Sequence, residues 1–253
     1  MNSELSTIVY EWMFTNTGND HRFIQPRSLM NDEDSQPFLP LQYEKFSKDI
    51  MKEKASSFFS LMDNRRTTRH FSEEPVEKEL IEFAIKTAST APSGAHLQPW
   101  TFVAINDQKL KSKIRDAAEI EEKKTYDERM PEAWAEVIQP LGTDYVKTHL
   151  TSAPWVVVLF RQSKRLRTNG EWGPTYYSME SCGIAAGLFI SAIHNMGLTT
   201  LTHTPSPMGF LRDLLDRPAH EHAMLVMPVG YPSKDAMVPD LTRKPLEDVA
   251  IFI

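Results

Sequence analysis

The sequence lacks the features that mark secreted, membrane-spanning or nucleic-acid-binding proteins. It has one cysteine, Cys182, which excludes an internal disulfide framework and favours a reducing compartment. Its net charge of -6 argues against a surface for nucleic acids or anionic membranes. Internal repeats and low-complexity tracts are also missing. We therefore expect a soluble, cytoplasmic globular protein without nucleic-acid partners.

Long apolar runs are missing as well. The longest, Cys182 to Ile193, is shorter than the roughly 20 residues that a membrane-spanning helix needs, so we expect a core helix with a buried structural thiol. Residues 1–20 are acidic and contain no apolar segment of signal-peptide length. The sequence thus predicts neither export nor a membrane anchor.

Composition along the chain indicates one packed domain preceded by an arm. Residues 31–37, NDEDSQP, are typical of a solvated linker. We therefore predict a loosely ordered N-terminal arm over residues 1–37 and a single domain over residues 38–253.

Hydrophobic periodicity predicts helices that alternate with strands. Several strands are apolar on both faces, which indicates a sheet covered by helices and an α/β or α+β class. The expected helices span residues 43–62, 75–88, 107–137, 173–196 and 208–215. The expected strands span residues 100–106, 153–162, 198–204 and 223–232.

Two basic clusters are candidate anion sites. The stretch NRRTTRHF gathers Arg65, Arg66 and Arg69 at the end of a predicted helix. Guanidinium groups match phosphate oxygens bidentately and stay charged, although a solvated cationic helix end would look the same. The later pair Arg243 and Lys244, taken alone, indicates a surface loop.

The stretch TAPSGAHLQPW, residues 90–100, joins a predicted helix to a predicted strand. Ser93 offers a hydroxyl, Gly94 has no side chain and Ala95 has a small one, so a flat ligand can lie against backbone N–H groups. A Pro-Ser-Gly helix stop is the alternative interpretation.

These motifs, in this order and spacing, resemble the flavin-binding pattern of the nitroreductase superfamily and, within it, the iodotyrosine deiodinase family. The resemblance extends from about Phe38 to Ile253 and includes GLTTLTHTP and LDRPAHE. It implies an α+β nitroreductase-like fold, with a central mixed sheet covered by helices. It also implies FMN at the interface of an intertwined homodimer with exchanged C-terminal segments.

The resemblance assigns roles to particular residues. Thr204, with Thr202 beside it, would place a hydroxyl near flavin N5 and favour one-electron steps, while the backbone N–H of Ala95 would hold a phenolate oxygen. By composition alone, threonines in a strand need only reflect β-propensity. The implied FMN contacts are Arg65, Arg66, Thr67, Thr68, Arg69, Ser93, Thr202, His203, Thr204 and Arg243. Among these, His203 departs from the threonine-rich pattern of the family.

The family's distinguishing feature is a lid that recognises an amino-acid zwitterion, expected here around residues 107–150. Glu122 and Tyr126 are spaced i, i+4 on one helical face, and Lys147 lies on the following segment. A carboxylate, a phenol and an ammonium can form a charge-complementary cage for a free amino acid. Without the resemblance, the same charges would be interpreted as a solvated helix face.

The expected function is FMN-dependent reductive dehalogenation of halotyrosines, converting 3-iodotyrosine and 3,5-diiodotyrosine to tyrosine and iodide. NAD(P)H would supply the electrons, directly or through a separate flavin reductase. Two alternatives stay open: a general NAD(P)H-dependent nitroreductase or quinone reductase, and a noncatalytic flavin or halotyrosine binder. No metal is predicted, since nothing pairs with His96 at metal-ligand spacing. Residues 162–177 are expected to form an exposed loop.

Overall fold

The computed structural model describes residues 38–253, so the predicted arm over residues 1–37 lies outside the described residues. Contacts divide the chain into two units, Met1–Phe46 and Ser47–Ile253. Residues 38–46 are exposed and form neither helix nor strand. All helices and strands given below belong to the second unit, and the predicted domain boundary near residue 38 stays a prediction.

A four-stranded sheet forms the centre of this unit, in the order β1 (Trp100–Ile105), β2 (Trp155–Gln162), β6 (Glu221–Gly230) and β5 (Thr199–Thr200). Every pairing among these strands is antiparallel, with Trp100 opposite Arg161 and Trp155 opposite Val229. The family resemblance implied a mixed sheet. That detail is wrong for the described strands, because their connections bring each neighbour into the sheet from the opposite end.

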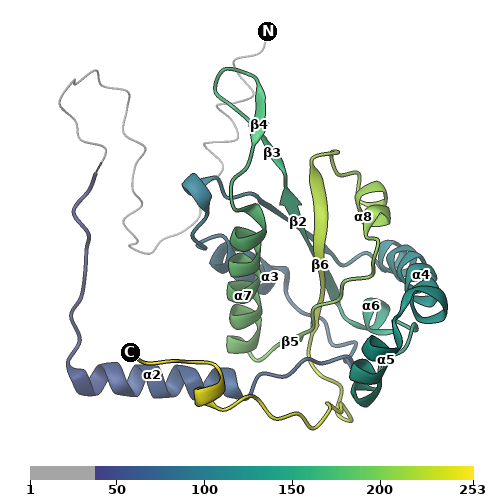
Figure 1. The fold of residues 1–253 in the computed structure, drawn as a ribbon, viewed down its shortest axis with the longest axis horizontal. Coiled ribbons are helices and arrows are strands. Elements are labelled where there is room, and N and C mark those ends of the chain that lie inside the picture. Colours follow the sequence, from purple (N-terminus) through teal and green to yellow (C-terminus); the bar gives the residue numbers. More distant parts are fainter. Residues whose placement is uncertain (1–37) are drawn as a thin grey trace. The chain divides into compact units, whose positions relative to one another are not determined.

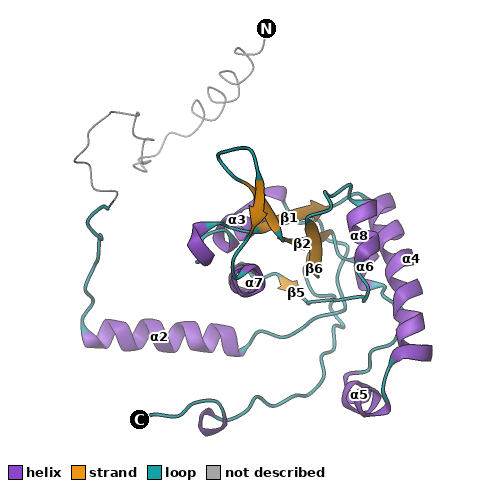
Figure 2. Ribbon diagram, turned by 45° about the horizontal axis from the view of Figure 1, so that its top comes forward, coloured by secondary structure: helices purple, strands orange, loops and turns teal. Residues whose placement is uncertain are grey.

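Helices cover both faces of the sheet, as predicted. Figures 1 and 2 show α3 and α7 on one side and α4, α6 and α8 on the other. The α-helices are α2 (Lys48–Asp63), α3 (Lys78–Ala88), α4 (Gln108–Lys124), α5 (Glu132–Ile138), α6 (His149–Ser152), α7 (Ser178–Asn195) and α8 (Gly209–Leu214). Shorter turns are η1 (Gly94–His96), η2 (Thr125–Arg129), η3 (Gln139–Leu141) and η4 (Leu246–Asp248).

Strand β2 divides the core because its side chains alternate between the two faces. Val157 and Leu159 pack in the cluster formed with α3 and α7. Val156, Val158 and Phe160 pack in the cluster formed with α4, α6 and α8. Buried strands covered on both faces give continuous apolar runs, which explains why this strand was predictable from its sequence.

The predicted helix over residues 107–137 is in fact three pieces. Asp107 caps the first piece, α4, by accepting a hydrogen bond from the backbone N–H of Leu110 at 2.7 Å. A π-turn, η2, follows α4, and Pro131 then caps α5. Pro131 lacks the N–H that a continuous helix would need and disfavours helical geometry at the residue before it, so the break has a local cause.

The segment expected to be an exposed loop contains a hairpin of β3 (Lys164–Leu166) and β4 (Trp172–Pro174). Figure 1 shows it projecting beyond the ends of β2 and β6. The Trp172 ring centroid lies 4.5 Å from that of His220. This tertiary contact stabilises the start of β4, and no local pattern in the sequence signals it.

The apolar run from residue 182 forms most of α7, a core helix as predicted. Cys182 is fully buried, and its Sγ donates to the carbonyl oxygen of Pro99 at 3.3 Å. Burial raises the pKa of this thiol to about 11, so it behaves as a structural thiol. None of the described helices is long and apolar enough to cross a lipid bilayer.

We expect that shortening a buried side chain at the centre of the sheet strongly destabilises the protein. Phe160 is among the largest fully buried side chains, so Phe160→Ala should lower the free energy of unfolding by about 3–5 kcal/mol. Ile120 is 57% exposed on α4, and Ile120→Ala should change it by less than about 0.5 kcal/mol. Urea unfolding followed by circular dichroism measures both. Equal losses would contradict the core assignment.

Candidate active site

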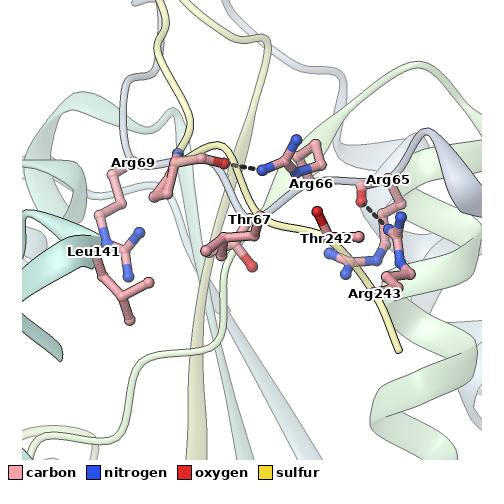
Figure 3. A pocket seen from close by; sticks show the side chains of 9 residues that line it. Arg65, Arg66, Thr67, Arg69, Leu141, Thr242 and Arg243 are labelled. Carbon is pink, nitrogen blue, oxygen red and sulfur yellow. Dashed lines mark hydrogen bonds between the residues drawn. The ribbon is translucent and has the colours of Figure 1, made fainter. Parts of the chain in front are cut away.

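A pocket of about 330 Å³ lies where the chain leaves α2. Arginines line it from two distant parts of the chain, and Figure 3 shows them on either side of Thr67. The lining residues are Arg65, Arg66, Thr67, Arg69, Leu141, Pro239, Leu241, Thr242 and Arg243. Thr68, also predicted as a cofactor contact, is buried and lines the neighbouring cavity behind Arg65 and Arg66.

Hydrogen bonds tie the C-terminal segment to the end of α2 and so build this arginine pocket. Arg243 donates from Nη1 to the backbone oxygen and to Oδ1 of Asp63, at 2.8 and 2.9 Å. It also donates from Nη2 to the backbone oxygen of Arg65 at 2.9 Å. Arg66 donates to the carbonyl oxygen of Pro239. The early and late basic clusters thus lie together in the structure, although they are far apart in the sequence.

Like charges crowd the arginine pocket. Burial, followed by the nearby charges of Arg243 and Arg66, lowers the pKa of Arg65. The guanidinium of Arg65 makes no hydrogen bond or ion pair with another residue between 38 and 253. An anion bound here would relieve this repulsion, which makes the pocket suitable for a phosphate group.

A second pocket, of about 390 Å³, shares Arg69 and Leu141 with the arginine pocket, so the two are contiguous. It is enclosed by α4, η2, α5, η3, α6 and the segment after β5. Its lining residues are Arg69, Glu122, Thr125, Tyr126, Met130, Trp134, Ile138, Leu141, Thr143, Lys147, His149, Leu201, Thr202, His203, Thr204 and Ser206.

The three predicted cage residues meet in this second pocket. Lys147 Nζ lies 3.1 Å from Glu122 Oε2 and 5.5 Å from the ring centroid of Tyr126. The hydroxyl of Tyr126 forms a 2.6 Å hydrogen bond with Thr143 Oγ1. A carboxylate, an ammonium and a phenol therefore share one cavity wall, as the spacing and the family resemblance predicted.

Glu122 is ionised although it is largely buried. Burial opposes ionisation, but the hydrogen bond from His203 and the charge of Lys147 outweigh it and hold the pKa of Glu122 below its usual value. Lys147 is only 5% exposed, so the ion pair is shielded from solvent. A buried pair of this kind is specific because removing either partner leaves an unpaired charge.

Backbone geometry explains how Lys147 reaches Glu122. Its backbone N–H donates to Glu119 Oε1 at 2.7 Å, and Arg115 Nε donates to the same oxygen at 2.7 Å. This anchors the returning segment one turn before Glu122 on α4. Tyr126 lies in the π-turn η2, a feature that is frequent at functional sites.

The segment after β5 presents alternate faces. His203 exchanges two backbone hydrogen bonds with Val226, both 2.9 Å, so this segment continues the sheet. Thr202 and Thr204 are exposed, whereas His203 is buried and contacts Glu122. The threonines are therefore available to a ligand in the cavity, while His203, predicted as a cofactor contact, is paired with the cage.

The predicted loop with Ser93 and Ala95 lies away from both pockets of its own chain. The backbone N–H of Gly94 points to Ser181 Oγ, at 3.3 Å, in the first turn of α7. His194, thirteen residues further along α7, lines the cavity behind Arg65. At 1.5 Å per residue these ends are about 20 Å apart. Thus the loop and the arginine pocket are not brought together within one chain.

The backbone of this loop is unusual. Ala95 has φ 51°, His96 φ 54° and Gln98 φ 47°, all in the left-handed region. A Cβ at Gly94 would lie 2.6 Å from the backbone oxygen of Tyr176, so this position requires glycine. Ser93 Oγ accepts from the backbone N–H of Gln98 at 3.0 Å and holds the turn. His96 Nε2 forms a local hydrogen bond with Gln98 Nε2 at 3.0 Å.

Several pocket residues were missed by sequence reasoning. Met130, Trp134 and Thr143 line the second pocket together with Thr202 and Thr204, and the ring of His149 contacts that of His203. The signal in the sequence was Trp134 itself, because large aromatic side chains on a charged helix often mark a binding surface. In the structure Trp134 is half exposed. No cluster of His, Cys, Asp and Glu suited to a metal occurs among residues 38–253.

Comparisons with known proteins agree with this geometry. Residues 62–231 match the model of the Nitroreductase family. An iodotyrosine deiodinase from Haliscomenobacter hydrossis is 49% identical over 207 residues, covering 82% of this chain and 93% of the relative. Iodotyrosine deiodinase 1 from Homo sapiens is 40% identical over 222 residues, covering 87% of this chain and 77% of the relative.

A solved structure extends the likeness to the fold. A crystal structure of oxidized iodotyrosine deiodinase bound to FMN and 3-iodo-L-tyrosine superimposes with a TM-score of 0.67 at 27% identity, covering 77% of this chain and all of that one. The chain therefore belongs to the nitroreductase family, in its iodotyrosine deiodinase branch.

We expect His149 to make the protein acid-sensitive. Burial, then the charges of His203, Lys147, Arg69 and Arg115, lower its pKa to about 3, against about 6.5 unfolded. Between these values the unfolded chain binds a proton that the native protein excludes. Stability should thus fall as pH drops below 6.5, by about 2 kcal/mol at pH 5 from this group.

Urea unfolding at pH 7, 6 and 5 tests this expectation. His149→Gln should flatten the dependence on pH, because glutamine takes up no proton in this range. The same slope in wild type and His149→Gln would contradict a neutral buried His149.

Proposed function

We propose that the protein is an FMN-dependent reductive dehalogenase of halotyrosines, converting 3-iodotyrosine and 3,5-diiodotyrosine to tyrosine and iodide. The observation that carries this proposal is the meeting of Glu122, Tyr126 and Lys147 in a pocket contiguous with the arginine pocket. One pocket suits an anionic cofactor tail and the other suits a free amino acid. The names of the relatives support the same activity.

The residues that line the arginine pocket suit the phosphate end of FMN. Crowding of Arg65 by Arg243 and Arg66 favours an anion, and Arg69 lines the boundary with the second pocket. Arg65, Arg66 and Arg69 would hold the phosphate and ribityl chain, with Thr67 and Thr68 beside them, and Arg243 would approach the pyrimidine edge. Reduced FMN supplies the two electrons that, with one proton, replace a carbon–halogen bond by carbon–hydrogen and release halide.

The chain's own groups orient the substrate. Glu122 takes its ammonium, and Lys147 and Tyr126 take its carboxylate, so that the ring is directed toward Thr202 and Thr204. Thr204 would provide the hydroxyl near flavin N5. The apolar side chains of Met130, Trp134 and Ile138 exclude water from the ring.

A homodimer completes the site in this proposal. The loop of Ser93 and Ala95 contacts the first turn of α7, whereas His194, about 20 Å further along α7, lines the cavity behind Arg65. A second copy can bring its loop to the arginine pocket, where Ala95 would hold the phenolate oxygen. Unpartnered apolar side chains on α2 and α7 support such an interface: Ile50, Met51, Phe58, Phe59, Met179 and Ile184 are all exposed.

In this proposal NAD(P)H is the ultimate electron donor, acting directly or through a separate flavin reductase. A general nitroreductase would need the arginine pocket but not the cage, and a noncatalytic binder would need the cage but no turnover.

Anaerobic turnover tests the reaction. We expect the FMN-loaded protein, reduced with dithionite, to release iodide and tyrosine from 3-iodotyrosine in a 1:1 ratio, measured against free reduced FMN. Tight binding without release would favour the noncatalytic binder. Nitroaromatic reduction without iodide release would favour the general reductase.

Lid variants separate the cage from the flavin chemistry. Glu122→Gln and Lys147→Met should each reduce kcat/KM for 3-iodotyrosine by at least about 100-fold, because each leaves a buried charge unpaired. Both should retain nitroaromatic reduction. Glu121→Gln is the matched control, since Glu121 bonds Lys124 and Arg129 at the surface next to Glu122. Equal effects on both substrates would overturn the role of the cage.

Flavin retention tests the arginine pocket without any turnover. Arg65→Met should weaken FMN binding by about tenfold or more, since a charge-assisted contact to phosphate is lost. Lys244→Met, at a neighbouring basic position outside the pocket lining, should leave the affinity within about twofold. Flavin fluorescence during titration of the apoprotein measures both, and equal affinities would contradict the assignment.

A further inference from the structure

His203 occupies a fixed position at the inner wall of the second pocket. Its backbone N–H and carbonyl both pair with Val226 at 2.9 Å, which ties the residue to the central sheet. Its side chain points to the opposite side from Thr202 and Thr204 and is 8% exposed. The backbone of His203 is therefore fixed by the sheet, which does not depend on the lid.

The partner of His203 is the cage carboxylate. His203 Nε2 lies 3.1 Å from Glu122 Oε1, while Lys147 Nζ lies 3.1 Å from the other oxygen, Oε2. His203 Nδ1 is buried without a hydrogen-bond partner among the described residues. Nε2 must therefore carry a proton to bond the carboxylate, and leaving Nδ1 as a bare lone pair avoids a buried, unsatisfied N–H.

We propose that His203 is a positioning residue for recognition of the substrate's amino group: it holds Glu122 through Oε1 and leaves Oε2 to exchange Lys147 for the substrate ammonium. This inference rests on the proposed function and adds a residue to its substrate cage. In the exchange, Glu122 replaces its ion pair with Lys147 by an ion pair with the substrate ammonium. Lys147 in turn forms an ion pair with the substrate carboxylate. One buried ion pair becomes two, with no net charge added to the cavity.

The exchange requires that Glu122 stay in place when Lys147 leaves it. Glu122 comes from the last turns of α4, directly before the π-turn η2, and its side chain has several rotatable bonds. Without His203, Lys147 would be the one remaining partner of the carboxylate among residues 38–253 in the substrate-free protein. A bond from the sheet, which is independent of the lid, keeps Oε2 aimed into the cavity and lowers the ordering cost of binding.

The charges around His203 favour its neutral form. Glu122 on α4, Lys147 before α6, His149 on α6 and Arg69 face it, with the two imidazole centroids 5.4 Å apart. Burial lowers the pKa of His203, the Glu122 bond partly offsets this, and Lys147 and Arg69 lower it further. Because the pKa of His149 is about 3, that ring stays uncharged over the same range.

Protonation of His203 would oppose substrate binding. An imidazolium bonded to Glu122 competes with the substrate ammonium for the same carboxylate and adds a positive charge to a cavity that already holds Lys147. Affinity should therefore be full above the pKa of His203 and fall as the pH drops through it, below 6.5. Glu122 itself has a lowered pKa and remains ionised in this window.

Equilibrium binding to the oxidised, FMN-loaded protein tests this inference, with flavin fluorescence as the readout between pH 5.0 and 7.5. At pH 7, His203→Ala should weaken 3-iodotyrosine binding by about tenfold or more, because the bond to a buried carboxylate is lost. His203→Gln should restore the affinity to within about threefold, since an amide N–H can replace Nε2–H. It should also lose the wild-type fall in affinity toward pH 5.

A ligand without the amino-acid end isolates the contribution of the cage. The phenol 2-iodophenol keeps the halogenated ring but carries neither charge, so it leaves the Glu122–Lys147 pair intact. Its affinity should differ by less than about twofold between wild type, His203→Ala and His203→Gln, because it makes no use of Oε2. Any titration of the phenol is common to both ligands and cancels in their ratio.

The outcomes are distinct. Wild-type affinity in His203→Ala, equal losses for both ligands, or the wild-type pH dependence in His203→Gln would each overturn the role of His203. If His203→Ala does not fold or retain flavin, the pH dependence of His203→Gln decides alone. Failure of the FMN-loaded wild type to bind 3-iodotyrosine at any pH would instead refute the proposed function, and this inference with it.

Discussion

The structure depends on the burial of β2 on both faces. Its residues from Trp155 to Phe160 are all buried, which is possible only if helices cover the sheet on each side. One side receives α3 and α7, and the other receives α4, α6 and α8. This arrangement sets α4, with Glu122, against the sheet extension that carries His203, so the cage is built across the layer boundary. The burial of β2 thereby determines where the cage lies.

Electrostatics divide the site into two parts with different requirements. The arginine pocket concentrates positive charge, and its guanidiniums gain most from a ligand that supplies negative charge. In the second pocket the opposite charges already neutralise each other, through Glu122 and Lys147. Arg69 lies on the border and belongs to both. A dianionic group is thus suited to one end and an overall neutral zwitterion to the other, which is how contiguous cavities can keep their ligands distinct.

Much of this organisation was predictable from sequence, because it depends on local signals. Continuous apolar runs identified β1, β2 and β6, and the spacing of Glu122 and Tyr126 placed both on one wall of the cavity. Other features depend on contacts that no local pattern records. The β3–β4 hairpin is accompanied by the packing of Trp172 on His220, and the pairing of His203 with Glu122 joins positions 81 residues apart. The distance of Ser93 and Ala95 from the pockets likewise follows from the direction of α7 and not from their motif.

The self-paired cage also explains how a small cavity can be selective. In the free protein Glu122 and Lys147 are bonded to each other, so neither charge is buried alone. A phenol without an amino-acid end leaves this pair intact and gains nothing from it. A ligand with only one of the two charges breaks the pair and leaves the other ion unpaired. The free energy lost in this way exceeds that gained from the new contact. Only a zwitterion replaces both halves at once. Selectivity for a free amino acid therefore comes from the bond that binding must break as much as from the bonds that it forms.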